Sequence, residues 1–397
     1  MNYTTITHCR SCGSDNLKDV LSLGNQKIVE FTSKPVSIPL ELIKCEVCEL
    51  VQLRHTTNPE LLWNEGYGYR SGVNDAMVKH LHGIAKDVEQ YLGTDDVVLD
   101  IACNDGTLLE GYTKNVTKVG IDPSSNVINY AKEKHPEYKL VNEFFSKEAF
   151  DKASVMPAQV ITCISMFYDL DDPGKFLEDV KSCLKVNGVF VIQQNYLGSM
   201  IKNCAFDNIC HEHLEYYSLT SLLMLLNRHG MTVFKVEEND LNGGSIRTYI
   251  CRIGERPLDS SVQKLFNAEN EMDVYGFGNK MEKVIESIRD VVMDIYKSGH
   301  TIYAYGASTR GGTLLQACGL VYPYIEKAVE RNPDKWGKTM ESTGIPIISE
   351  KQARQENPDY MIILPWFFAD HFIEREKEYL FGGGKFIVPL PKLRIIQ

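Results

Sequence analysis

The stretch Val97-Val-Leu-Asp-Ile-Ala-Cys-Asn-Asp-Gly-Thr-Leu-Leu109 decides the fold of this chain. Residues 97–101 are apolar except for Asp100, and this β-favouring run predicts a strand buried on both faces. Small and polar residues follow at 102–106, and residues 107–109 are again compatible with a helix. A strand that passes through a tight turn into a helix opens a ligand site at the carboxyl end of an α/β sheet.

A second short strand, Lys118-Val-Gly-Ile-Asp-Pro123, follows soon after. It ends in Asp122, and an acid in this place usually binds the ribose hydroxyls of a nucleoside. Strands and helices continue to alternate up to residue 195. The pattern predicts strands at 97–101, 117–121, 138–141, 159–164 and 188–193, with helices at 126–134 and 175–184. This alternation predicts an α/β fold with a mostly parallel, doubly wound sheet.

The loops after the first four of these strands are expected to line one crevice that binds a nucleoside cofactor. A dinucleotide site would need Gly-x-Gly-x-x-Gly, of which only Gly106 is present, and the nearby acids would repel a pyrophosphate. Acids suit a ligand that carries an ammonium and a sulfonium, which favours S-adenosylmethionine over NAD. The turn departs from the usual methyltransferase pattern because Ala102 and Asn104 replace glycines. The expected cofactor-binding residues are Asp100, Ala102, Cys103, Asn104, Asp105, Gly106, Asp122, Glu143, Phe144 and Ser165.

The amino-acid composition limits the classes of protein to which the chain can belong. The 397 residues are 43% hydrophobic and 24% charged, which is typical of globular proteins of roughly two to three domains. We see neither an apolar run long enough to span a membrane nor a secretory signal, so we expect a cytoplasmic protein whose eleven cysteines are reduced. The net charge of −11 argues against nucleic acid as a partner.

Two Cys-x-x-Cys pairs, Cys9-Arg-Ser-Cys12 and Cys45-Glu-Val-Cys48, lie near the N-terminus. Four thiolates can close a tetrahedral Zn²⁺ site completely, so the pairs predict a structural zinc module. Two alternatives are a redox dithiol, which would need only one pair, and a catalytic zinc, which would keep an open coordination position for substrate. The 32 residues between the pairs exceed the commonest spacing of such sites.

Two further segments carry side chains suited to catalysis. Residues 61–72 are rich in aromatic residues and glycine, and form either a packed linker or a lid that presents a phenol to substrate. The cluster His211-Glu-His213 suits acid–base chemistry, because a carboxylate beside an imidazole can orient it and tune its pKa. Its alternative is a capped helix start with surface charges. A metal site there is disfavoured, because histidines two residues apart do not share a helical face.

The C-terminal third predicts a second α/β domain. Gly243-Gly244 is expected to make a tight turn near Arg247, which could meet an anionic ligand. Residues 300–316 again pass from a strand through small residues into a helix, where Ser308, Thr309 and Arg310 could seat a phosphate. Alternatively, the glycines of this segment serve only tight packing. Later strands are expected at 360–364 and 385–388, and the domains at 1–70, 71–260 and 261–397.

Taken in order, these motifs make the chain similar to the nucleotide-sugar C-methyltransferases, including the C-3 methyltransferases of deoxysugar pathways. The resemblance covers nearly the whole length. It lies in the cysteine pairs, with Cys45-Glu-Val-Cys-Glu-Leu-Val-Gln-Leu53, and in Gly66-Tyr-Gly-Tyr69, Asp100 to Gly106, His211-Glu-His213, Gly243-Gly244 and Tyr305-Gly-Ala-Ser-Thr309.

The resemblance implies a zinc module, a class I S-adenosylmethionine domain and a C-terminal Rossmann-like domain that helps to hold a nucleotide-diphosphate sugar. In this family a base removes the proton beside a ketone, and the enolate attacks the methyl group. Glu212 and His213 match the family's catalytic pair, with His213 as the base, and Tyr67 matches an active-site tyrosine. Tyr69, Asn195, Arg247, Ser308 and Arg310 are the residues expected to bind substrate.

Two positions depart from the family pattern. Cys210 replaces a catalytic tyrosine, with His211 beside it, and Asp169, preceded by Tyr168, stands where a histidine is expected. Tyr168, Asp169 and His211 are therefore candidates for the displaced roles. O- or N-methylation of a sugar nucleotide or small metabolite stays open as an alternative, and so does a zinc-ribbon module that binds RNA or protein. We expect a monomer without a membrane partner.

Overall fold

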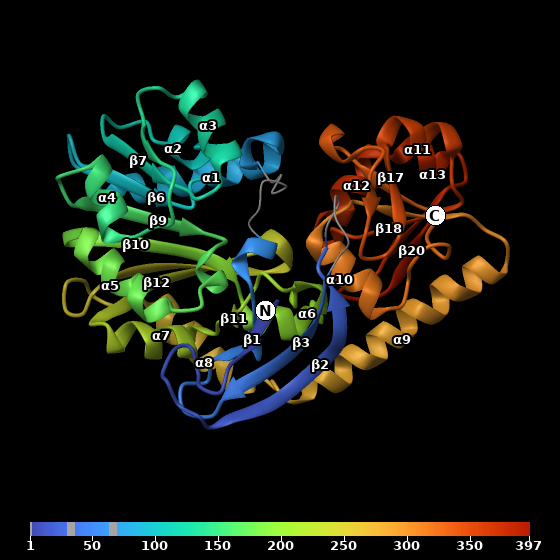
Figure 1. Ribbon diagram of the computed structural model, residues 1–397, viewed down its shortest axis with the longest axis horizontal. Coiled ribbons are helices and arrows are strands. Elements are labelled where there is room, and N and C mark those ends of the chain that lie inside the picture. Colours follow the sequence, from blue (N-terminus) through green and yellow to red (C-terminus); the bar gives the residue numbers. More distant parts are fainter. Residues whose placement is uncertain (1, 30–35, 63–69) are drawn as a thin grey trace.

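The computed structural model describes residues 2–29, 36–62 and 70–397. A seven-stranded sheet, built around the stretch that follows Val97, forms the core of the domain at the left of Figure 1. Five neighbouring strands pair in parallel, and a hairpin adds the other two strands, each antiparallel to its neighbour. In sheet order the strands are β12 (Met231–Asn239), β13 (Ser245–Arg252), β10 (Leu184–Asn195), β9 (Ala158–Ile164), β6 (Val97–Ile101), β7 (Thr117–Ile121) and β8 (Lys139–Val141). The doubly wound α/β fold is therefore confirmed.

Helices cover both faces of this sheet because its buried residues alternate in direction along each strand. Val98 packs in one apolar cluster with α1 (Asp75–Val88), α2 (Thr107–Glu110) and α3 (Ser125–Lys134). Leu99 packs in another, with α4 (Lys147–Ala153), α5 (Pro173–Cys183), α7 (Leu219–Arg228) and α8 (Ser260–Ala268). All five residues of β6 are buried, and β6 lies between β9 and β7 in the sheet. Its carboxyl end therefore lies within the sheet edge and not at a corner of the sheet.

The N-terminal cysteine module has its own four-stranded sheet, and one strand of that sheet comes from far along the chain. The sheet order is β11 (Glu215–Tyr216), β4 (Val51–Leu53), β3 (Ser37–Cys45) and β2 (Leu17–Lys27), while β1 (Tyr3–Thr5) pairs with β5 (His55–Thr57). Glu215 lies opposite Gln52, and the amide of Leu53 donates to the carbonyl of Leu214. The segment that carries His211-Glu-His213 therefore runs directly into the sheet of the cysteine module.

A second seven-stranded sheet follows the helix α9 (Gly276–Lys297), which runs diagonally below it in Figure 1. Its order is β16 (Thr339–Met340), β17 (Ile345–Ser349), β15 (Lys327–Glu330), β14 (Ile302–Tyr305), β18 (Tyr360–Ile363), β19 (Lys385–Val388) and β20 (Arg394–Ile396), with antiparallel strands only at the two edges. The apolar stripe of α9 shares one core with this sheet and with Leu40 and Leu42 of β3. The cysteine module and the C-terminal sheet are thus joined by packing.

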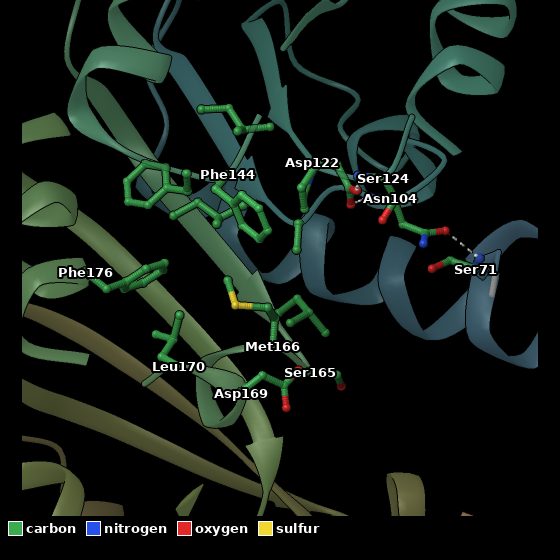
Figure 2. A pocket seen from close by; sticks show the side chains of 16 residues that line it. Ser71, Asn104, Asp122, Ser124, Phe144, Ser165, Met166, Asp169, Leu170 and Phe176 are labelled. Atoms are coloured by element: carbon green, nitrogen blue, oxygen red, sulfur yellow. Dashed lines mark hydrogen bonds between the residues drawn. The ribbon is translucent and has the colours of Figure 1, made fainter. Parts of the chain in front are cut away.

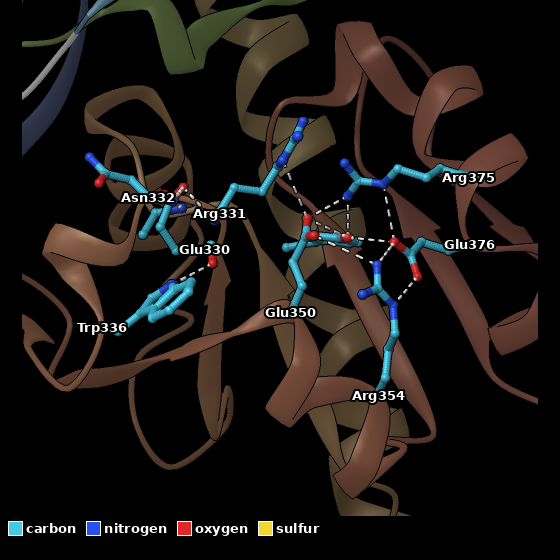
Figure 3. A network of polar contacts seen from close by, with 10 residues as sticks. Glu330, Arg331, Asn332, Trp336, Glu350, Arg354, Arg375 and Glu376 are labelled. Carbon is cyan, nitrogen blue, oxygen red and sulfur yellow. Dashed lines mark hydrogen bonds and ion pairs between the residues drawn. The ribbon is translucent and has the colours of Figure 1, made fainter. Parts of the chain in front are cut away.

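Charged side chains fasten the helices of the C-terminal sheet, as Figure 3 shows. Glu350 begins α11 (Glu350–Glu356), and Glu376 lies between α12 (Ala369–Arg375) and α13 (Lys377–Phe381). Arg354 donates to Glu376 at 3.0 Å, and Arg375 contacts both glutamates. Among the described helices, no segment combines the length and apolar character that a membrane span requires.

Candidate functional site

The turn after β6 takes an unusual backbone shape. Ala102, Asn104 and Gly106 have φ values of 56°, 52° and 81°. These left-handed conformations are the ones that glycines normally provide, and asparagine tolerates them better than most residues. The replacement of glycines by Ala102 and Asn104 therefore leaves a glycine-type turn in place.

Side chains of this turn are held by the neighbouring segments. Asp122, at the end of β7, accepts the amide of Asn104 at 2.9 Å and that of Ser124 at 2.8 Å. Asn104 in turn accepts the amide of Ser71 at 3.0 Å. The Asp105 carboxylate accepts the amide of Gly72 at 2.9 Å and so fixes the chain that enters α1. Asp105 and Gly106 thus shape the turn, and neither residue lines the two cavities beside it.

A cavity of about 250 Å³ opens beside the turn (Figure 2). Polar groups lie at one end, and aromatic and sulfur-containing side chains at the other. Asp122 and Asn104 at the polar end suit a ribose and an amino-acid moiety, while the apolar end suits a flat purine. Its lining includes Ser71, Ala102, Asn104, Asp122, Ser124, Phe144, Phe145, Ser165, Met166, Asp169, Leu170 and Phe176.

Glu143 does not belong to this lining, which corrects the sequence prediction. Its carboxylate turns outward and binds Lys152 at 2.7 Å, with 45% of the side chain exposed. The neighbouring Phe144 lines the cavity instead. Asn142 donates to the backbone carbonyls of Asp122 and Pro123 and thereby holds the two cofactor loops together.

A larger cavity of about 430 Å³ begins at the same turn and extends to the C-terminal sheet. Of the predicted residues, it brings together Asp100, Ala102, Cys103, Asn104, Ser165, Tyr168, Asp169, Asn195, Glu212, His213, Ser308 and Arg310. Burial raises the pKa of Asp100 to about 7, and Thr162 donates to its carboxylate at 2.6 Å. The two cavities share Ser71, Ala102, Asn104, Ile164, Ser165 and Asp169.

One ring nitrogen of His213 is held by a hydrogen bond, and the other is available to accept a proton. Nδ1 lies 2.9 Å from the carbonyl of Asn208, which can only accept, so Nδ1 carries the proton and Nε2 carries the lone pair. Burial lowers the pKa of His213 to about 4, so the ring is neutral at pH 7. The ring of Tyr168 packs edge-on against it at 4.5 Å. A neutral imidazole of fixed tautomer in a cavity is suited to accept a proton.

Two other predicted site residues have structural roles. The Nε2 of His211 lies 3.2 Å from the carbonyl of Ile38 in β3, away from both cavities, so His211 joins the site segment to the cysteine module. Arg247 donates to Asp87 at 2.8 Å and to Gln193 at 3.1 Å. Its charge is already balanced inside the central domain, and it lines neither cavity. These placements correct the catalytic role expected for His211 and the substrate contact expected for Arg247.

The C-terminal sheet contributes Arg310 and Ser308 to the larger cavity. The hydroxyl of Ser308 caps α10 (Thr309–Ala317) by accepting the amide of Gly311. Arg310 pairs with the buried Asp207 at 2.7 Å, and Trp366 donates to the same carboxylate oxygen at 3.1 Å. The guanidinium also stacks over Phe367 at 4.8 Å. These contacts fasten the C-terminal sheet to the segment that precedes His213.

The four N-terminal cysteines converge as predicted. Their Sγ atoms all lie within 4.8 Å of one another, and Cys9–Cys48 and Cys12–Cys45 are each separated by 3.5 Å. A tetrahedral Zn²⁺ with bonds of about 2.3 Å places its sulfur ligands about 3.8 Å apart. These thiols therefore fit one zinc ion with every coordination position filled by protein. Tyr67 and Tyr69, predicted as catalytic and substrate-binding, lie outside the described residues.

Several residues that support the site carry no signal in the local sequence pattern. Asn208 acts through its backbone carbonyl, which a sequence does not display. Asp207 becomes important only because Arg310 reaches it from 103 residues away. The run Trp366-Phe367-Phe368 could have been noticed as three consecutive aromatic residues, and Phe367 and Phe368 do line the larger cavity.

Three family models match consecutive parts of the chain. The "Putative zinc binding domain" matches residues 9–63, the "Methyltransferase domain" residues 73–236 and the "C-methyltransferase C-terminal domain" residues 240–391. C-methyltransferase NovU of Streptomyces niveus is 30% identical over 411 aligned residues, which cover 99% of this chain and 97% of that protein. The ubiquinone/menaquinone biosynthesis C-methyltransferase UbiE of Campylobacter jejuni strain RM1221 is 28% identical over 113 residues, 26% of this chain and 46% of that protein.

Solved structures resemble one part of the chain. An S-adenosylmethionine-dependent methyltransferase from Clostridium acetobutylicum is 15% identical with a TM-score of 0.36, and covers 45% of this chain and 92% of its own. The plantazolicin methyltransferase BpumL, solved with S-adenosylhomocysteine, is 16% identical with a TM-score of 0.34, and covers 43% of this chain and 82% of its own.

The fold, the cofactor cavity and the matched domains define an S-adenosylmethionine-dependent methyltransferase with a structural zinc module. The full-length similarity to NovU is more specific, and the chain belongs to the zinc-containing C-methyltransferase family. The predicted family, enzyme class and cofactors are thereby confirmed. S-adenosylmethionine, when bound, would supply an electrophilic methyl group.

Proposed function

We propose that this enzyme methylates a carbon atom beside the ketone of a nucleotide-diphosphate-linked sugar. The observation that carries the proposal is the geometry of His213. Its Nδ1 is fixed by the Asn208 carbonyl, while its ring lines the cavity that adjoins the methyl-donor site. O- and N-methylation need no base for a carbon-bound proton, whereas C-methylation beside a ketone does.

The shape of the larger cavity supports a substrate longer than a simple metabolite. It extends from Asn104 at the cofactor turn to Ser308 and Arg310 at the start of α10. The amino end of a helix attracts phosphate groups, because its first amide protons are unpaired within the helix. Phe367 and Phe368 add aromatic walls that suit a sugar or base ring. A sugar at the turn and a diphosphate near α10 would fill this space.

Proton exchange tests the reaction directly. The enzyme is incubated in D₂O with S-adenosylhomocysteine and a nucleoside-diphosphate 4-keto-6-deoxyhexose, so that deprotonation can occur without methylation. Deuterium should enter the carbon beside the ketone, and His213→Ala should slow this entry by about 10²–10⁴-fold. The exposed His371 provides a matched control, because His371→Ala should exchange at the wild-type rate. If the enzyme forms a methylated product from the same sugar nucleotide with S-adenosylmethionine but shows no exchange with S-adenosylhomocysteine, O- or N-methylation is indicated instead.

A further inference from the structure

Two carboxyl groups face the same cavity as His213. Asp169 ends the short helix η4 (Phe167–Asp169) that follows β9, and Glu212 lies in the turn before β11. Both line the larger cavity, and Asp169 also lines the cofactor cavity, where Figure 2 shows it beside Ser165. Different parts of the chain therefore bring two acids to the place where the methyl donor and the base meet.

Each of these carboxyl groups has one oxygen closed to solvent without a hydrogen-bond donor. Among the described residues, no donor reaches Asp169 Oδ1 or Glu212 Oε2. Cys210, Thr309 and the backbone amide of Glu212 donate to the Glu212 carboxyl group, so the loss of hydration without a donor concerns the closed oxygen alone. A proton on one carboxyl group would remove one charge and would make that group a hydrogen-bond donor to a ligand in the cavity.

The surrounding charges do not compensate two carboxylates. Arg310, the cation of the cavity lining, is already paired with Asp207 at 2.7 Å, and His213 is neutral at pH 7. The other titratable groups that face the pair are Tyr168, Cys210, Glu215, Tyr216 and Asp100, which are neutral or acidic. Within the part of the chain that the structure describes, the pair thus lacks a cation of its own.

Burial acts on both groups in the same direction. It raises the pKa of Glu212, and it raises the pKa of Asp169 well above its ordinary value, with the charges of Glu212 and Glu215 adding to the effect. Two carboxyl groups that interact in this way release their protons in two separate steps that belong to the pair. The first proton is lost easily and the second only at higher pH.

We infer that Asp169 and Glu212 share one proton at neutral pH, and that this pair is the acid that donates a hydrogen bond to the ketone oxygen of the substrate while His213 removes the carbon-bound proton. The role of the pair as an acid rests on the proposed function. The shared proton is a property of the protein alone.

The reaction balances with these groups. His213 Nε2 takes the proton as the carbon–hydrogen bond breaks, and the electron pair forms a carbon–carbon double bond while the ketone oxygen becomes an enolate stabilised by the acid pair. That double bond then supplies the electrons for the new bond to the methyl carbon, the sulfur–methyl bond breaks and its electrons remain on sulfur. The ketone re-forms, the acid pair keeps its proton and His213 releases one proton to water.

Infrared difference spectra of the ligand-free protein test the shared proton without any substrate. At pH 7, wild type minus Asp169→Asn should show the loss of one protonated carboxyl band, and Asp370→Asn, which removes a 94% exposed carboxyl group, should show none. Asp169→Asn should also fold and melt near the wild-type temperature, because an amide of the same shape replaces a carboxyl group without adding a charge. A spectrum in which neither Asp169→Asn nor the double variant Asp169→Asn/Glu212→Gln loses a protonated carboxyl band at pH 7 would overturn the inference.

The pH dependence of the deuterium exchange tests the role of the pair as an acid. With S-adenosylhomocysteine bound, wild-type exchange should fall about tenfold per pH unit once the pair loses its proton. Asp169→Asn keeps an N–H donor at every pH, so its exchange should be slower but without this alkaline decline, and Asp169→Leu should lose about 10²–10³-fold. An unchanged alkaline decline in Asp169→Asn would refute the acid role. A shared proton in the infrared spectrum with no exchange by any keto-sugar nucleotide would refute the proposed reaction alone.

Discussion

Asp207 offers a stringent test of how the C-terminal sheet is attached to the methyltransferase domain. Its side chain is 1% exposed, and one oxygen accepts Arg310 Nε at 2.9 Å, lies 2.7 Å from Arg310 Nη2 and accepts Trp366 Nε1 at 3.1 Å. Asp207→Ala removes all of these contacts and leaves the guanidinium, only 15% exposed, without a counter-ion. We therefore expect a large loss of stability from one substitution.

The magnitude follows from the burial of the pair. Breaking a fully buried ion pair by removing one partner costs about 3–5 kcal/mol. Arg310 borders a cavity where water can reach it, which lowers the expected loss to about 2–4 kcal/mol. For a chain of this size that corresponds to a fall in Tm of about 2–5 °C. Asp207→Asn keeps an acceptor oxygen but loses the charge, and should cost about half as much.

Calorimetric melting of a double-mutant cycle measures this coupling. Asp207→Asn, Arg310→Met and the double variant are compared with wild type, and the double variant should lose at least about 1 kcal/mol less than the sum of the single variants. The exposed pair Lys147–Asp151 is the matched control, and Asp151→Asn there should cost less than about 1 kcal/mol. Additive effects at Asp207 and Arg310, or a loss no larger than that of Asp151→Asn, would refute the reasoning.

Three further predictions concern the base, the metal and the cofactor. His213→Ala should abolish methyl transfer while calorimetric binding of S-adenosylmethionine is retained, and a preserved kcat would exclude His213 as the base. Cys9→Ser should lower the zinc content measured by atomic emission and destabilise the N-terminal module; unchanged metal content and melting would contradict a structural zinc. The pKa of Asp100 is about 7 in the free protein, so its carboxyl group is mostly protonated below pH 7. A cofactor whose ammonium binds the Asp100 carboxylate must then displace that proton. The Kd for S-adenosylmethionine should then rise by up to about tenfold per pH unit, and Asp100→Asn should remove this dependence.

The central fold is predictable because its strands are short, apolar and bounded by turns. The predicted strands 97–101 and 117–121 agree with β6 and β7 at both ends. The pairing of β11 with β4 is a different case. It joins residues more than 150 positions apart through backbone atoms, and a two-residue strand leaves no periodic pattern. Local sequence therefore predicts the elements well, and predicts poorly which distant elements meet.

The candidate site likewise combines residues that the local sequence predicts with contacts between distant residues that it does not. Residues at the ends of predicted strands, such as Asp100 and Asp122, lie in the cavities because strand ends meet at one sheet edge. Glu143 and Phe144 follow the same strand, and only the direction of each side chain decides which one faces the cavity. Arg247 is an apparent anion ligand in the sequence, yet Asp87, from a helix 160 residues earlier, neutralises it. Charge compensation between distant residues is invisible to a local pattern.

The pairing of β11 with the sheet of the cysteine module has a consequence for protein engineering. The sequence predicts a module that ends near residue 70, but its sheet includes the strand that begins two residues after His213. A chimaera that takes residues 1–70 from a relative would place a foreign β4 and a foreign Ile38 carbonyl against the native segment, and would shift the base without altering any residue of the methyltransferase domain. Functional exchange of this module requires residues 205–218 to travel with it.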